Sequence, residues 1–311
     1  MVREYDFNVY WEDRAQRYLG EDRDGYAAVL YLGEPVWYNR FFACFQERAL
    51  KDQLGNPCTD SPQRVLEIGC GTGRWAELLS RYGSYTGVDI SPSLIKRVQL
   101  RLSFRHDFRR QYQLKYRFSL LLLGFSSKIE AKLPLQDKSD CTLIKRAIQL
   151  HPMFNFFCMS ATQLAFPSLS FDRVVTVTVL QHLPFPFQEL AIGEICRVTK
   201  SEGMIHCLEL IYERNAAPHV YPNTLAEWCD KFRAYSCHLI SAKGQEYAPL
   251  IRLERGWYHR LMGKRGFRHY RSVRPPLLKV LLSISYPLEH FLSRLLPTQF
   301  ARHVVATYVK E

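Results

Sequence analysis

The residues whose types and spacing best suit chemistry are two acidic residues, Glu67 and Asp89, on either side of a turn that contains Gly69, Gly71 and Gly73. Glycines let a ligand approach the backbone closely, because they carry no Cβ. Two carboxylates suit a ligand with a cationic end and a ribose diol. Asp89 can accept hydrogen bonds from both ribose hydroxyls, while Glu67 faces an ammonium or a sulfonium.

The pattern around these residues predicts the elements that position them. A short apolar run, Val65, Leu66 and Ile68, precedes the glycines, and apolar residues at helical spacing follow from Trp75 onward. This order indicates a strand, a tight turn and a helix. A second short strand at residues 85–88 then ends on Asp89. The sequence therefore predicts one half of a nucleotide-binding βαβ unit.

The spacing of the glycines argues against two common nucleotide sites. A dinucleotide turn of the form G-x-G-x-x-G would need its third glycine at Arg74, whereas this chain has it at Gly73. A P-loop would need Gly-Lys followed by Ser or Thr at the start of the helix, and the chain has Gly-Arg-Trp there. NAD and ATP therefore both fit poorly.

Several ordered motifs resemble those of the class I S-adenosylmethionine-dependent methyltransferases, specifically the small-molecule group often called type 11 methyltransferases. They occupy residues 67–73, 87–91, 170–175, 179–184 and 194–203, and the resemblance covers roughly residues 62–212. It implies an α/β, Rossmann-like sheet of seven strands with helices on both faces. It also implies that S-adenosyl-L-methionine binds over the carboxyl ends of the strands, where open α/β sheets place their ligands.

The resemblance implies a set of residues that hold this methyl donor: Glu67, Gly69, Cys70, Gly71, Gly73, Asp89, Ile90, Ser160, Ala161, Val177 and Leu180. Ser160 departs from the family pattern, which has an acidic residue against the adenine. A hydroxyl can still accept a hydrogen bond from the adenine amino group, although it is a weaker partner than a carboxylate.

The same comparison suggests residues near the transferred methyl group. His182 is a candidate general base, because imidazole titrates near neutral pH, and a structural role is the alternative. Glu209 is a second candidate catalytic residue, with solvation or an ion pair as its alternative. Tyr18 and Tyr212 are candidate substrate contacts.

Two segments lie outside the common motifs. Residues 1–61 are expected to form an N-terminal helical lid in which Trp11, Arg14 and Tyr18 face the ligand, with core packing as the alternative. Residues 62–311 are expected to form the methyltransferase domain. An insert at about residues 99–152 separates its second and third strands, because the next motif arrives much later than a connection requires.

The C-terminal part of the chain predicts the remaining strands. We expect the fourth strand at residues 171–178, the fifth at 204–211, the sixth at 267–273 and the seventh at 301–310. Residues 277–296 carry leucines at helical spacing and are expected to form two amphipathic helices that separate at Pro287.

The distribution of charge in the sequence indicates which kinds of partner the protein could bind. The net charge is +12, and residues 96–117 and 252–274 each carry eight Lys or Arg against one acidic residue. These stretches suggest an anionic partner, which could be a nucleic acid such as RNA, a membrane surface or a phosphorylated substrate.

The nine cysteines include no C-x-x-C pair, so we expect no disulfide framework and no metal site. The start of the chain is charged and no apolar run is long enough to span a membrane. We therefore expect a cytoplasmic protein, with attachment to the periphery of a membrane as an alternative.

Three functions follow from these patterns. The first is methyl transfer from S-adenosylmethionine to a small-molecule or glycan-like acceptor, at oxygen more readily than at nitrogen or carbon. The second keeps the donor pocket but makes RNA the acceptor, bound through the two basic stretches. The third is a non-catalytic binding scaffold, suggested by Ser160 and the long insert.

Overall fold

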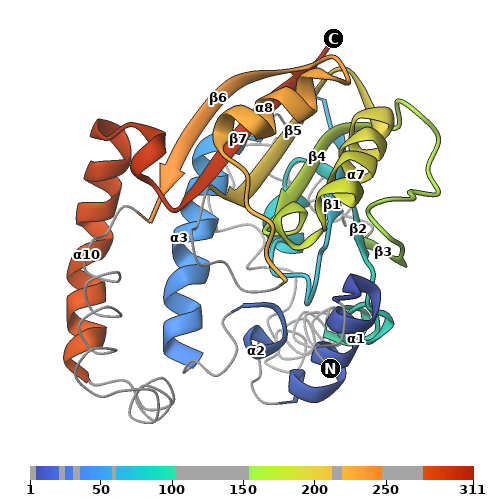
Figure 1. Cartoon of the computed structure of the whole chain (residues 1–311). Coiled ribbons are helices and arrows are strands. Elements are labelled where there is room, and N and C mark those ends of the chain that lie inside the picture. The colour runs from blue at the N-terminus through green and yellow to red at the C-terminus, as the bar shows by residue number, and fades with distance from the viewer. Residues whose placement is uncertain are drawn as a thin grey trace, which may run out of the picture.

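A computed structural model describes residues 5–20, 25–30, 36–57, 61–101, 154–211, 219–246 and 276–311. Its centre is a seven-stranded sheet with the strand order β3-β2-β1-β4-β5-β7-β6 (Figure 1). The strands are β1 Gln63–Ile68, β2 Gly83–Asp89, β3 Phe154–Cys158, β4 Phe171–Val177, β5 Thr199–Leu210, β6 Cys237–Gln245 and β7 His303–Lys310.

Strand β1 pairs in parallel with β2 on one side and with β4 on the other. The chain therefore reverses its direction of strand addition at β1, and the carboxyl ends of β1, β2 and β4 meet at one edge of the sheet. In open α/β sheets this is the position of the ligand crevice. Strand β7 runs antiparallel to both β5 and β6. The architecture confirms the predicted Rossmann-like sheet of seven strands.

Helices cover both faces of this sheet, and the alternation of side chains along β4 shows why. Val174 packs into a core cluster with α7 (Phe185–Val198) and α8 (Leu225–Arg233), while Val175 belongs to a second cluster with α3 (Val36–Leu54) and α4 (Ala76–Leu79). Successive residues of a strand point to opposite faces. A continuous β-branched run is therefore the pattern that a strand buried on both sides requires.

The N-terminal part supplies α1 (Phe7–Tyr18) and the short α2 (Tyr26–Val29) before α3. Helix α3 packs against β5, β6 and β7, and α1 lies near the carboxyl edge of the sheet (Figure 1). Residues 92–101 form a further helix after β2. The predicted insert and the basic stretch 96–117 lie outside the described residues from residue 102 onward, as do Tyr212 and all of the stretch 252–274.

The sixth strand and the helix before the last strand differ from prediction. Strand β6 is Cys237–Gln245, whereas the predicted segment 267–273 lies outside the described residues. Helix α10 (Pro276–Leu295) continues through Pro287, where two helices were predicted. Pro287 lies on an exposed part of the helix, where solvent reduces the cost of a missing backbone donor.

The short 3-10 helices are η1 (Leu180–His182) and η2 (Thr298–Phe300). No described helix is both long and apolar enough to cross a membrane.

Candidate functional site

The turn after β1 adopts a backbone conformation that only glycine accepts without strain. Gly69 and Gly71 have φ angles of 68° and 53°. A Cβ built on Gly69 would overlap Cγ2 of Val179, and one on Gly71 would lie 3.0 Å from Cγ1 of Val29. A side chain at either position would therefore fill the space beside the turn, so the glycines keep the backbone open to the crevice.

Asp89 ends β2 directly beside this turn. Its Oδ2 accepts a hydrogen bond from the Gly71 amide at 2.8 Å, and its Oδ1 accepts one from the Ser91 amide at 3.0 Å. Burial raises the pKa of Asp89 to about 6, against the pull of these backbone amides. Each carboxylate oxygen can accept two hydrogen bonds, so both oxygens retain capacity for a ligand.

Glu67 lines the same pocket, but its side chain is protonated at neutral pH in the ligand-free chain, whereas a carboxylate was predicted from the sequence. The side chain is almost wholly buried, and the hydroxyl of Tyr85 donates to its Oε2. Burial raises the pKa of Glu67 to about 8. In the ligand-free chain Glu67 is therefore predominantly protonated at neutral pH. A cationic ligand beside it would favour the carboxylate again.

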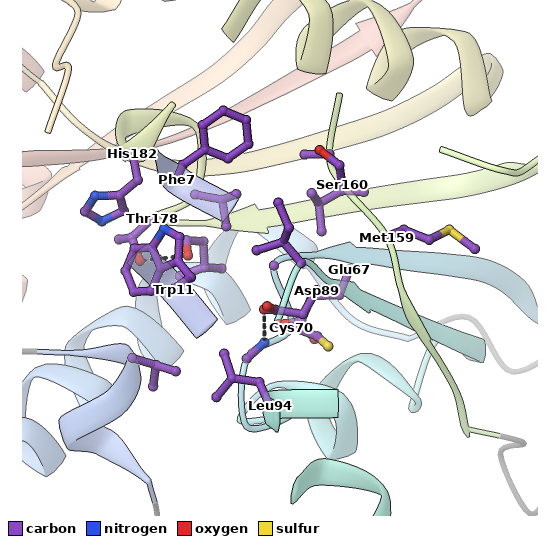
Figure 2. A pocket seen from close by; sticks show the side chains of 18 of the residues that line it. Phe7, Trp11, Glu67, Cys70, Asp89, Leu94, Met159, Ser160, Thr178 and His182 are labelled. Carbon is purple, nitrogen blue, oxygen red and sulfur yellow. Dashed lines mark hydrogen bonds between the residues drawn. The ribbon is translucent and has the colours of Figure 1, made fainter. Parts of the chain in front are cut away.

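A pocket of about 810 Å³, including its open mouth, lies over the glycine turn (Figure 2). All of the predicted donor-binding residues except Gly73 and Leu180 line it. Leu180 is fully buried in the core, and a Cβ on Gly73 would overlap Val98 in the helix behind the turn. Ser160 and Ala161 line the pocket after β3, where Ser160 Oγ lies 2.8 Å from Thr162 Oγ1.

The opposite wall of the pocket comes from helix α1 and the segment after β4. Phe7 and Trp11 of α1 line it together with Thr178, His182 and Leu183. Figure 2 shows Trp11 beside Thr178 and His182, with Asp89, Glu67 and Cys70 in the other half of the view. The Trp11 and His182 rings meet edge to face, with 5.0 Å between their centroids. The two walls therefore come from parts of the chain that are far apart in sequence.

His182 lines the pocket, but in a state that makes it a weak base. Its Nδ1 lies 3.0 Å from the backbone oxygen of His219, so Nδ1 carries the proton and donates it. Burial lowers the pKa of His182 to about 3. The ring is therefore neutral across the physiological range, and Nε2 is its hydrogen-bond acceptor.

Glu209, the second predicted catalytic residue, does not line the pocket. Its carboxylate accepts hydrogen bonds from the backbone amides of Val179, Leu180 and Gln181 at 3.0–3.2 Å, and the Thr176 hydroxyl donates to it at 3.3 Å. Burial raises the pKa of Glu209 to about 7 despite these donors. Glu209 thus supports the backbone of the segment that carries His182.

Of the three residues of α1 that were predicted to face the ligand, one lines the pocket and two do not. Trp11 faces the pocket, whereas Tyr18 packs beside Ala15, Ala28 and Leu94. Arg14 is buried and donates to the backbone oxygens of Ala27 and Leu30. These two residues of α1 therefore contact α2 and the residue that follows it.

Several residues that line the pocket were not predicted. They include Phe7, Val29, Arg74, Trp75, Leu94 and Met159. Thr178 has a φ angle of 55°, which a β-branched residue rarely adopts. No sequence pattern signals that conformation. Arg74 and Trp75 directly follow the glycine turn, so their position in the motif could have identified them.

Within the described ranges, no group of three or more His, Cys, Asp or Glu is arranged to hold a metal ion. The seven cysteines in the described ranges are all free thiols.

A family model matches much of this chain, and solved structures are similar to it. A family model described as a methyltransferase domain matches residues 37–243. Among solved structures, the chain is similar to a TehB-like SAM-dependent methyltransferase from Corynebacterium glutamicum, with 14% identity, a TM-score of 0.46, and coverage of 97% of this chain and 99% of that one. It is also similar to the 1,6-didemethyltoxoflavin-N1-methyltransferase of Burkholderia thailandensis, with 12% identity, a TM-score of 0.47, and coverage of 100% and 93%. The search of curated proteins found no match.

The family match spans most of the sheet, from α3 to β6, and includes the glycine turn, Asp89 and the segment that carries His182. The sheet has seven strands, as predicted, and β7 runs antiparallel to both of its neighbours. The chain belongs to the methyltransferase domain family, and it is a class I enzyme whose methyl donor is S-adenosylmethionine.

Proposed function

We propose that this enzyme binds S-adenosylmethionine in the pocket over the glycine turn and transfers its methyl group to a hydroxyl of a small-molecule or glycan-like acceptor. The observation that carries the proposal is the arrangement of Asp89. Two backbone amides fix its carboxylate at the end of β2, beside a turn that is kept open by glycines. A fixed carboxylate with spare acceptor capacity is the partner that a ribose diol requires.

The remaining lining supports the same donor. Ile90 and Met159 line the same pocket with apolar side chains, and Ser160 lines it with a hydroxyl. These groups suit a purine ring with an exocyclic amino group. Glu67 also lines the pocket and is suited to a cationic ligand, because a nearby positive charge would lower its raised pKa.

When bound, S-adenosylmethionine supplies a methyl group on a sulfonium, which needs neither a metal nor an acid to activate it. The residues of this chain then align the acceptor and exclude water, which are the tasks of Phe7, Trp11 and Leu183. Nε2 of neutral His182 lies 3.4 Å from the side-chain nitrogen of Gln181, and it can accept the proton of an acceptor hydroxyl in place of that contact. Because its pKa is about 3, His182 is a weak base, and alignment carries most of the rate.

Calorimetric titration with S-adenosylhomocysteine, the product form of the donor, tests the donor site. We expect the native chain to bind it and Gly71→Arg to lose binding, because the new side chain would occupy the turn. Gly20→Arg is the matched control, since a Cβ at Gly20 meets nothing within 4 Å. Equal affinity in all three proteins would refute the proposed site.

A direct assay can identify the chemical class of the acceptor and the atom that is methylated. Transfer of labelled methyl groups to a panel of hydroxyl, amine and carbon acceptors, with the native chain and Gly71→Arg side by side, should identify hydroxyl compounds that only the native chain methylates. Labelling confined to amines or to carbon would refute the assignment to oxygen while leaving the donor site intact.

The exposed side of α10 supports one further proposal about where the enzyme works, namely at an anionic membrane surface. Val280, Ile284, Leu288, Phe291 and Leu295 recur at helical spacing and are all exposed, with Ile284 at 63% and Phe291 at 59%. Helix α10 lies at the periphery beside α3 (Figure 1). In sequence it directly follows the basic stretch 252–274. Apolar residues next to basic charge are typical of helices that lie on anionic lipid.

Co-sedimentation with lipid vesicles tests this surface. We expect binding to vesicles that contain phosphatidylserine, weaker binding to pure phosphatidylcholine, and loss of binding in Ile284→Glu/Phe291→Glu. Val9→Glu is the control, because Val9 is an exposed apolar residue on α1. Binding that does not change in the double variant would refute a role for α10.

A further inference from the structure

Glu12 joins helix α1 to the segment that follows Asp89. Its Oε2 accepts hydrogen bonds from the Ser91 hydroxyl at 2.5 Å and from the Ser93 amide at 3.2 Å. Its Oε1 accepts one from the Ser93 hydroxyl at 2.5 Å. The Nε2 of Gln16, one turn further along α1, donates to the same oxygen at 2.8 Å. One carboxylate therefore holds four donors, three of them from a part of the chain about eighty residues away.

The electrostatic setting favours the ionised form of this carboxylate. Glu12 lies at the N-terminus of the helix at residues 92–101, where unpaired backbone amides and the helix dipole attract negative charge. Partial burial would raise its pKa, but the hydrogen bonds from Ser91, Ser93 and Gln16 lower the pKa to about 2. The contact is therefore intact at any pH at which the enzyme would work.

The position of this contact connects it to the donor pocket. The amide of Ser91 donates to Oδ1 of Asp89, so the residue that Glu12 holds is also one that fixes the proposed ribose carboxylate. Trp11, the neighbour of Glu12, and Phe7, about one turn earlier, line the pocket. Glu12 does not line it. Its influence on the pocket therefore acts through Ser91 and through the placement of α1.

A second contact fixes the other end of α1. The hydroxyl of Tyr5 donates to the backbone oxygen of His182 at 2.8 Å. Helix α1 thus bridges the crevice, tied near Tyr5 to the segment after β4 and at Glu12 to the segment after β2. Because both walls of the pocket are tied to this one helix, loss of either tie should let α1 move away from the crevice.

We propose that Glu12 is a positioning residue of the donor site, which holds α1 across the crevice so that Phe7 and Trp11 close the pocket over the bound donor. This inference rests on the proposed function, because it takes the pocket to be the site of S-adenosylmethionine. Removal of the carboxylate leaves the pocket residues in the chain but releases the wall that α1 provides. The donor then binds more weakly and dissociates faster.

Calorimetry with S-adenosylhomocysteine on matched variants tests the proposal. We expect Glu12→Ala to weaken binding by about tenfold or more, which corresponds to the loss of a charge-assisted contact. Glu12→Gln should recover part of the affinity, because its amide oxygen can still accept from a serine hydroxyl. Asp13→Ala is the control, since Asp13 is the next residue of α1 and its exposed side chain pairs only loosely with Arg17 at 3.5 Å. Its affinity should stay within about twofold of native.

A change in Ser93, which donates to Glu12, provides a second test of the same contact if Glu12→Ala folds poorly. Ser93→Ala should also weaken binding, and the double variant Glu12→Ala/Ser93→Ala should bind about as weakly as Glu12→Ala alone, because both changes remove the same contact. Fully additive losses would overturn the proposal, since they would show that the two residues act independently.

Proteolysis gives a readout that a change in overall stability alone would not produce. Helix α1 contains Arg14 and Arg17, which are trypsin sites. We expect S-adenosylhomocysteine at saturation to slow cleavage there in the native chain and in Asp13→Ala, but much less in Glu12→Ala. Native affinity and native protection in Glu12→Ala would overturn the role of Glu12. Failure of the native chain itself to bind the product would instead overturn the proposed function, and this inference with it.

Discussion

The backbone amide of Gly71 donates a hydrogen bond to Oδ2 of Asp89 across 2.8 Å, which ties the turn after β1 to the end of β2. The two strands are parallel neighbours, with Ile68 opposite Val88 in the register, so their carboxyl ends arrive side by side. The bond holds a buried carboxylate at the floor of the pocket. Burial of that charge costs stability in the ligand-free chain, and binding of a ribose diol would recover part of it.

The raised pKa of Asp89 predicts that donor affinity and ligand-free stability change with pH in opposite directions. The pKa rises from an ordinary value of 3.8 to about 6, so the folded chain binds a proton more readily than the unfolded chain. The contribution of Asp89 to stability is therefore full below about pH 4 and is lost as the pH rises through about 6. Donor affinity requires the carboxylate, so it should fall below about pH 6.

Calorimetry with S-adenosylhomocysteine from about pH 5 to pH 7.5 checks the predicted fall in donor affinity at low pH. We expect binding to be about tenfold weaker at the lower end, as protonation of one acidic group predicts. An Asp89→Asn variant should bind weakly throughout and lose this pH dependence. A native affinity that does not change over the range would contradict the role given to the Asp89 carboxylate.

Glu67→Gln should stabilise the ligand-free chain at alkaline pH. Burial raises the pKa of Glu67 from 4.5 to about 8, so its contribution to stability is lost as the pH rises through about 8. Glutamine is uncharged and can still accept the hydrogen bond from the Tyr85 hydroxyl. Urea unfolding should therefore give little difference between the two proteins near pH 4.5 and a gain for the variant that grows as the pH rises toward 8, to more than about 1 kcal/mol near pH 9. A variant that is less stable than native at pH 9 would contradict the assignment.

Gly69→Ala should lose both stability and donor affinity. The φ angle of 68° costs an L-residue roughly 1 kcal/mol, and the new Cβ would overlap Val179 on the pocket wall. We expect a loss on the order of 2 kcal/mol in the free energy of unfolding. Gly20→Ala is the matched control, because its Cβ would meet nothing within 4 Å, and it should stay within about 0.5 kcal/mol of native.

Glu209→Gln should destabilise the segment that carries His182. Its carboxylate accepts three backbone amides, and a glutamine would turn an NH₂ group toward at least one of these donors. Because a buried donor would then lack an acceptor, the free energy of unfolding should fall by about 2 kcal/mol. Glu189→Gln, an exposed residue paired with Lys231, should change it by less than about 0.5 kcal/mol. A loss of methyl transfer with native stability would instead indicate that Glu209 takes part in the chemistry.

The part of the site around Asp89 could be predicted from sequence because its requirements are local. A glycine turn after an apolar strand fixes the backbone, and a carboxylate at the end of the next parallel strand must lie beside it. The predicted donor-binding residues that do not line the pocket show the limit of this reasoning. Gly73 and Leu180 lie within the motifs, but Gly73 backs onto Val98 and Leu180 points into the core. A motif gives the position of a residue along the chain and not the direction of its side chain.

The far wall of the pocket could not be predicted because it depends on tertiary packing. Phe7 looks like any aromatic residue of an amphipathic helix, yet it lines the pocket because Glu12 and Tyr5 tie α1 across the crevice. The state of His182 depends on its burial and on the His219 carbonyl, which lies thirty-seven residues away. The edge strand β6 was missed because it buries few of its side chains, so it lacks the apolar pattern of the inner strands.

A crystal structure of the chain with S-adenosylhomocysteine tests the central claim most directly. The account predicts both ribose hydroxyls within about 3 Å of the Asp89 carboxylate, with the sulfur toward Trp11 and Thr178. Electron density for the compound away from the glycine turn, or a turn occupied by side chains of the protein while the compound lies elsewhere, would contradict it.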